Sequence, residues 1–107
     1  MCTIPERRHS FQRIAERILY EQTQPVDYLH IWLNGYQTVD SALPRNPRII
    51  YHLEPENPGP WVRYRVADNL AENDILITLD DDLYYPTDYI NSGLNELSRK
   101  KSADVIS

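Results

Sequence analysis

The sequence predicts an α/β fold with a mainly parallel sheet of about four strands and helices on both faces. Short apolar segments typical of strands recur along the chain, and segments with helical spacing separate most of them. No internal repeat interrupts this order. Parallel strands need long crossover connections, which the intervening helical segments supply. At 107 residues, we expect residues 1–107 to form a single domain.

The first elements are a short strand and an amphipathic helix. A strand is expected at residues 1–4 and ends before Pro5, which lacks the N–H needed for a strand ladder. The helix is expected to run from a cap at Ser10 to about Gln22, because its apolar residues recur on one face. These residues are Phe11, Ile14, Ala15, Ile18 and Leu19.

Two strands come next. Residues 26–33 alternate between two apolar or aromatic sets, which predicts a strand buried on both faces. The turn residues Asn34 and Gly35 end it. A further strand is expected at residues 48–53. The proline-rich segment 54–60 is expected to be a loop.

The last part of the chain repeats the alternation. Pro60 suits the first turn of a helix, which is expected to reach about Asn73. Residues 74–79 are expected to form a strand. Thr87 is expected to cap a final helix, and residues 104–107 have the composition of another strand.

Composition restricts the class of partner. The net charge of −5 argues against binding to nucleic acid phosphates or to an acidic membrane surface. The single cysteine, Cys2, excludes an internal disulfide framework. No apolar run has the length of a membrane span, and the first residues do not resemble a signal peptide. We therefore expect a cytoplasmic protein that binds small molecules or proteins.

Three consecutive carboxylates, Asp80, Asp81 and Asp82, follow the strand expected at residues 74–79. If strand geometry continues, Asp80 and Asp82 point one way and Asp81 the other. Their mutual repulsion in a partly desolvated place requires a cation. Carboxylates suit Mg²⁺, Mn²⁺ or Ca²⁺, and Mg²⁺ completes its shell with waters and substrate phosphates. The triplet thus predicts a cation site for a phosphorylated ligand, with a solvated acidic turn as the alternative.

Three segments carry a family resemblance. They are Thr3-Ile4-Pro5-Glu6-Arg7-Arg8, Gly59-Pro60-Trp61-Val62-Arg63 and Leu79-Asp80-Asp81-Asp82-Leu83-Tyr84-Tyr85-Pro86. In this order and spacing the chain resembles the nucleotide-sugar-binding half of A-type glycosyltransferases, especially family-2-like members. The resemblance covers essentially the whole chain. It implies a Rossmann-like sheet that binds a nucleoside at the carboxyl ends of its first strands.

The resemblance also implies roles for the carboxylates. In that family the aspartate motif holds Mn²⁺ or Mg²⁺ against the diphosphate of the donor. Asp82 would be the metal ligand, and Asp80 would contact the ribose or a metal-bound water, so both are candidate metal residues. Asp81 would support either one. A UDP-sugar is the favoured donor, because UDP is frequent in such enzymes.

Five further residues match positions around the nucleotide. Thr3, Pro5 and Arg7 match the loop that borders the nucleoside, and Arg63 matches a basic residue near the base or the phosphates. The second strand commonly ends in an aspartate that reads the base. This sequence has Asn34 there, which accepts and donates hydrogen bonds without charge.

The resemblance covers only part of such an enzyme. These enzymes place the acceptor site and, in inverting members, the catalytic base in a second half of the domain. Because nothing follows Ser107 in the sequence, we expect a fragment with a truncated sheet that holds nucleotide and metal. The catalytic residue, the sugar and the acceptor are therefore left open.

Two other functions compete with glycosyl transfer. A strand followed by Asp-x-Asp also begins phosphohydrolases of the haloacid dehalogenase class, in which Asp80 would attack phosphate and Asp82 would act as acid and base. A non-catalytic interaction domain is the third hypothesis. His30 and His52, on neighbouring predicted strands, are interpreted as hydrogen-bonding histidines in preference to a metal pair.

Overall fold

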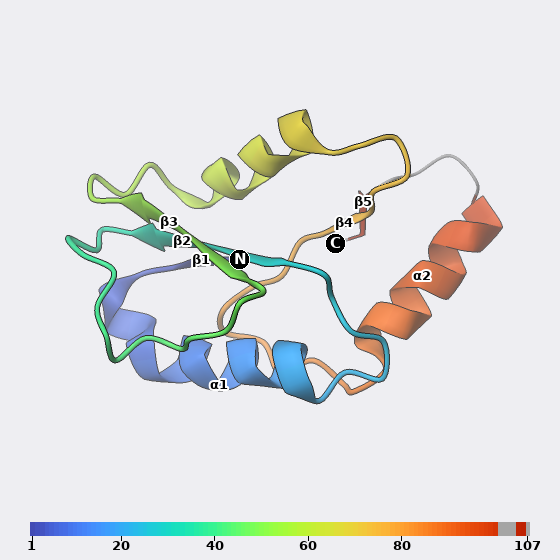
Figure 1. Cartoon of the computed structure of the whole chain (residues 1–107), viewed down its shortest axis with the longest axis horizontal. Coiled ribbons are helices and arrows are strands. Elements are labelled where there is room, and N and C mark those ends of the chain that lie inside the picture. Colours follow the sequence, from blue (N-terminus) through green and yellow to red (C-terminus); the bar gives the residue numbers. More distant parts are fainter. Residues whose placement is uncertain (101–104, 107) are drawn as a thin grey trace.

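The computed structural model describes the backbone of residues 1–100 and 105–106 and the side chains of residues 1–98. Helical segments separate the strands along the chain, except between β2 and β3 (Figure 1). In chain order they are β1 (Cys2–Thr3), the 3₁₀ helix η1 (Pro5–Arg7), α1 (Arg8–Tyr20), β2 (Leu29–Asn34), β3 (Ile49–Glu54), the 3₁₀ helix η2 (Pro60–Asn69), β4 (Leu76–Ile77), α2 (Tyr89–Lys100) and β5 (Val105–Ile106). The expected mixed α/β class is confirmed.

The main sheet is parallel and has the order β1-β2-β3. Strand β2 is central, and its ladder with β3 runs from Leu29↔Ile49 to Asn34↔Glu54. Strand β4 pairs in parallel with β5 in a separate two-stranded sheet. The described strands therefore do not form the single sheet of about four strands that was expected.

Asp80 links the acidic segment to the main sheet. It forms an isolated parallel bridge with Cys2, on the edge of β1 opposite β2. Only Leu76 and Ile77 of the strand expected at 74–79 are paired as β4. The acidic segment is thus attached to β1 at one residue rather than along a full ladder.

Helix α1 covers one face of the sheet, because all five apolar residues predicted on its face are buried. They pack against the β2 residues Leu29, Ile31 and Leu33 in one core. The helix begins at Arg8 instead of after Ser10, since the 3₁₀ turn that starts at Pro5 leads directly into it. The Ser10 hydroxyl donates to the Arg7 carbonyl at 3.1 Å and does not cap the helix.

The opposite face carries η2, so helices lie on both sides of β1–β3 (Figure 1). This segment was expected to be an α-helix to about Asn73 but is a 3₁₀ helix that ends at Asn69. Val62 is its one fully buried residue, so η2 has a narrower apolar face than α1. Runs of 3₁₀ helix longer than about three or four residues are uncommon, so the ten residues of η2 form an unusually long one.

The C-terminal elements begin close to their expected places. Helix α2 starts at Tyr89, two residues after the predicted cap Thr87. Val105 and Ile106 form β5, while the other two residues of the strand expected at 104–107 lie outside the described residues. Within the described part of the chain, no helix has both the length and the apolar character needed to cross a membrane.

Candidate functional site

A cavity of about 690 Å³ opens at the carboxyl ends of β1 and β2 and beside the acidic segment. It is lined by every site residue named from the sequence except Pro5, which is exposed at the start of η1. The lining residues from that set are Thr3, Arg7, Asn34, Arg63, Asp80, Asp81 and Asp82. Segments far apart in the sequence therefore meet at one place.

The path of the chain explains this location. From β1 the chain crosses through α1 to β2 and then to β3, moving to one side of β1. It returns through η2 and β4 to reach Asp80 on the other side of β1. Because the strands are parallel, their carboxyl ends lie at the same edge of the sheet. Ligands of open α/β sheets bind where the connections diverge in this way.

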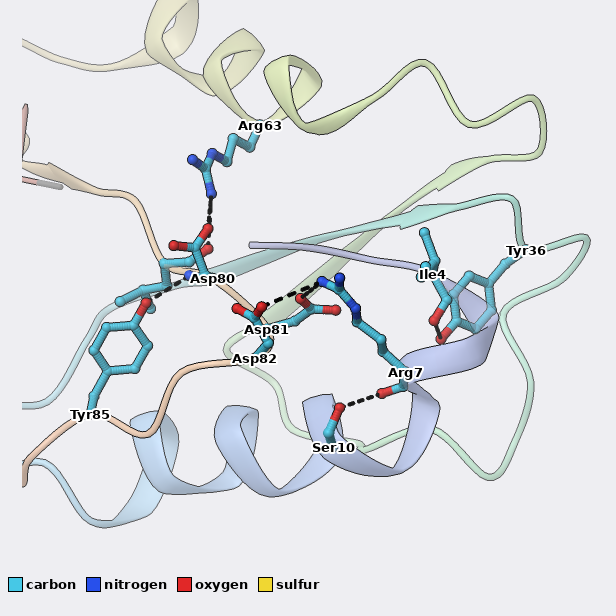
Figure 2. Close-up of polar contacts among 10 residues, drawn as sticks. Ile4, Arg7, Ser10, Tyr36, Arg63, Asp80, Asp81, Asp82 and Tyr85 are labelled. Carbon is cyan, nitrogen blue, oxygen red and sulfur yellow. Dashed lines mark hydrogen bonds and ion pairs between the residues drawn. The ribbon is translucent and has the colours of Figure 1, made fainter.

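Asp81 is buried and forms an ion pair with Arg7 of η1 (Figure 2). Its Oδ1 accepts a hydrogen bond of 2.8 Å from Arg7 Nη1. This hydrogen bond and the Asp81 charge raise the pKa of Arg7. Asp82 is largely exposed, and its Oδ2 lies 3.9 Å from the same Arg7 nitrogen. Arg7 is thus shared by two carboxylates.

Asp80 is held from the other side of the cavity by Arg63 of η2. Arg63 Nη1 donates to Asp80 Oδ1 at 2.9 Å and to the Leu79 carbonyl at 3.2 Å. The Asp80 backbone N–H donates to the Tyr85 hydroxyl at 2.7 Å. The expectation that Asp80 and Asp82 point the same way is wrong, because residues 81 and 82 form a turn and both approach Arg7.

Asn34 lies at the end of β2 and is fully enclosed. Its Nδ2 donates to the Gly59 carbonyl at 3.1 Å, so the amide group has a fixed orientation. Its Oδ1 is buried and has no hydrogen-bond partner among the described residues. A buried acceptor without a partner is costly, so this oxygen marks a place for a donor group of a ligand or a water.

One wall of the cavity comes from the proline-rich segment 54–60, whose residues were not among the predicted site residues. Asn57, Pro58 and Gly59 line it, between β3 and η2. Asn57 has φ of 48° and Gly59 has φ of 96°, values that asparagine and glycine tolerate best. The density of prolines and glycine in this segment was the available signal, since such residues fix a loop in one shape.

The carboxylates fit a divalent ion in part. In the described region of the chain, no group of three or more His, Cys, Asp or Glu side chains converges as metal ligands do. Asp82 is largely exposed and lies 3.9 Å from Arg7, whereas Asp80 is held by Arg63 at 2.9 Å. These hard oxygen donors suit Mg²⁺ or Mn²⁺ only if water and phosphate oxygens complete the coordination.

His30 and His52 lie away from this cavity, on the neighbouring strands β2 and β3. His30 Nδ1 and His52 Nε2 are 2.9 Å apart and share a hydrogen bond, and both rings stack with Trp32. Burial lowers the pKa of both rings. The interpretation of these residues as hydrogen-bonding histidines is confirmed, and the structure shows that they bond to each other. Burial also raises the pKa of the Cys2 thiol, which keeps it in the unreactive form.

No protein-family model, curated protein or solved structure matches this chain. The chemistry of the site therefore rests on its own geometry.

Proposed function

We propose that this chain is the donor-binding half of a glycosyltransferase of the A-type fold, which binds a nucleoside-diphosphate sugar together with Mn²⁺ or Mg²⁺. One observation carries the proposal. The residues matched to that family come from four distant segments, and all except Pro5 line a single cavity.

The strand order supports a Rossmann-like architecture for this half. Across the sheet the order is β3, β2, β1 and then Asp80, with all neighbours parallel. This is the arrangement in one half of a dinucleotide-binding sheet, where the ligand sits between the first and fourth strands. The acidic segment occupies the position of the fourth strand.

The chemistry of the cavity walls suits a nucleoside diphosphate. Its volume of about 690 Å³ lies in the usual range for small-molecule sites. Arg7 and Arg63 supply guanidinium groups that bind phosphate oxygens through paired hydrogen bonds. The Asn34 amide, with its Oδ1 free to accept, suits a ring N–H or a hydroxyl of the nucleoside.

In the proposed reaction an acceptor hydroxyl attacks the anomeric carbon while the nucleoside diphosphate departs. Asp82 and Asp80 would hold the metal ion, which when bound supplies positive charge against the departing diphosphate. Arg7 and Arg63 would bind and orient the phosphates, beside the wall formed by residues 57–59. In this proposal the acceptor site and the catalytic base belong to the second half of the enzyme. The enzyme would act in the cytoplasm.

The first test compares UDP binding with Mn²⁺ and with EDTA by isothermal titration calorimetry. We expect Mn²⁺ to tighten UDP binding and Asp82→Asn to remove that gain. The affinity for UDP in Mn²⁺ should then fall about tenfold or more, because a charged metal ligand contributes over about 1.4 kcal/mol. Asp27→Asn is the matched control, since Asp27 is exposed near the start of β2, at the opposite end of the strand from the cavity.

Other outcomes would replace the proposal. If Asp82→Asn and the unsubstituted chain bind UDP equally well in Mn²⁺, Asp82 is not a metal ligand. Hydrolysis of an aryl phosphate that disappears in Asp80→Asn would establish the phosphohydrolase instead. If Mn²⁺ with UDP leaves the melting temperature unchanged, an interaction domain is the better description, because a ligand specific to the folded state must raise stability.

A further inference from the structure

We infer that Arg7 and Arg63 are internal counter-ions, which hold the carboxylates until cation and phosphate arrive and thereby make the binding of each depend on the other. The ligand class rests on the proposed function. The coupling itself rests on the two ion pairs and on the burial of Asp81.

Each arginine reaches its carboxylate from a different element. Arg7 comes from η1 and Arg63 from η2, and they contact Asp81 and Asp80 at 2.8 and 2.9 Å. The Asp81 side chain is only 4% exposed, so its charge requires a partner. Arg7 is that partner.

The ion pairs leave part of the polar network unsatisfied. Asp81 Oδ2 and Arg63 Nε are buried and lack hydrogen-bond partners among the described residues. Asn34 Oδ1, on a separate strand but lining the same cavity, is also buried without one. A half-satisfied buried network is costly, and these atoms include both acceptors and a donor. The walls are therefore suited to a ligand that has groups of both kinds.

A cation alone binds poorly in this arrangement. It must displace a guanidinium from a carboxylate, and the displaced guanidinium then repels it at short distance. A phosphate alone faces the converse problem, because it must draw an arginine away and leaves a carboxylate unpaired beside it. Each ligand by itself breaks an ion pair without replacing it.

Together the two ligands exchange partners with the protein. The cation takes over Asp80 and Asp82, and the phosphate oxygens take over Arg63. Arg7 then bridges the buried Asp81 and a phosphate oxygen, so that no charge is left unpaired. Each ligand then removes the obstacle to the other. By linkage, the factor by which the cation tightens phosphate binding equals the factor by which phosphate tightens cation binding.

The test replaces the arginines and measures each ligand separately. In Arg63→Gln and Arg7→Gln, we measure Mn²⁺ alone by the electron paramagnetic resonance signal of free Mn²⁺, and inorganic pyrophosphate alone by calorimetry in EDTA. We expect each variant to bind Mn²⁺ up to about fivefold more tightly than the unsubstituted chain does. The gain is limited to this size because the ion pair that is lost is partly exposed. We expect pyrophosphate to bind more weakly.

Controls separate this effect from a loss of structure. Arg13→Gln removes an exposed arginine of α1 and should change neither affinity. Arg7→Lys keeps the charge and should restore weak binding of Mn²⁺ alone. Arg63→Gln is the safer variant for folding, because Asp80 is 52% exposed and can be solvated when its partner is removed.

The inference requires that the affinities for Mn²⁺ and for pyrophosphate change in opposite directions. If the folded Arg63→Gln variant binds both ligands more weakly, or binds Mn²⁺ alone unchanged, the arginine has only a structural or a phosphate-binding role and the inference fails. If UDP binds with Mn²⁺ but the opposite changes are absent, the proposed function survives without the coupling. Opposite changes with pyrophosphate in a chain that does not bind UDP would preserve the coupling and remove the proposed function.

Discussion

The segment from β1 to β3 and residues 55–88, which follow it, differ in how regular their structure is. The first contains a six-residue parallel ladder and the buried face of α1. The second contains η2, with one fully buried residue, and the two-residue strand β4. A strand or helix becomes regular and long only where a complementary surface covers it, so the first segment is the scaffold for the second.

The second segment joins the scaffold through the core residues Leu79 and Tyr85 and through polar contacts. Arg17 of α1 donates to the Tyr85 carbonyl at 2.6 Å, and Gln22 donates to the Pro86 carbonyl at 2.7 Å. The Thr23 N–H donates to the Thr87 carbonyl at 2.8 Å. The candidate site lies between the two segments, with Arg7 and Asn34 from the first and Arg63 and the carboxylates from the second.

The largest difference between the two segments is expected when the same substitution is made in each of them. Ile31 is fully buried in β2, whereas Ile75, before β4, is 44% exposed. We expect Ile31→Ala to lower the free energy of unfolding by about 2–5 kcal/mol because it opens a cavity in the core. Ile75→Ala should change it by less than about 0.5 kcal/mol. Urea unfolding followed by tryptophan fluorescence measures both, and equal losses would mean that the second segment is equally well packed.

A smaller effect is expected where the second segment is fixed beside β1. Tyr85→Phe keeps the ring against Tyr89 but removes the hydroxyl that accepts the Asp80 N–H. We expect a loss of about 1 kcal/mol in the free energy of unfolding and weaker Mn²⁺-dependent UDP binding. Tyr28→Phe is the control, because Tyr28 is 64% exposed. Unchanged UDP binding in Tyr85→Phe would show that the hydroxyl does not position the acidic turn.

The smallest effect concerns pH and the scaffold alone. Because the pKa values of His30 and His52 are lowered from 6.5 by burial, the folded state binds fewer protons than the unfolded state below that pH. The contribution of these histidines to the free energy of unfolding is therefore fully present above pH 6.5. It is lost as the pH falls through the lowered pKa values. The double variant His30→Gln with His52→Gln should flatten this dependence in urea titrations between about pH 7.5 and 5.

The matched control for the pH experiment is His9→Gln, at an exposed position of α1. It should retain the pH dependence of the unsubstituted chain. If His9→Gln flattens the dependence as strongly as the double variant does, the histidine pair is not its source.

Much of the scaffold could be predicted from local pattern. The spacing of Phe11, Ile14 and Ile18 placed α1 on the core, and the alternation around Leu29 and Ile31 placed β2 within it. The extent of η2 and β4 could not be predicted, because local pattern does not report how much partner surface covers a segment. The directions of Asp81 and Asp82 depended on a turn that strand alternation did not reveal.

The site was predicted as a set of residues but not as a set of contacts. The sequence by itself determined an acidic triplet at the end of an apolar segment and arginines near the starts of two helices. Only the tertiary structure decided that Arg7 pairs with Asp81, Arg63 with Asp80, and that Asn34 binds Gly59. The physical reason is that these contacts join residues from different elements, so they form only when the parallel strands bring their carboxyl ends to one edge.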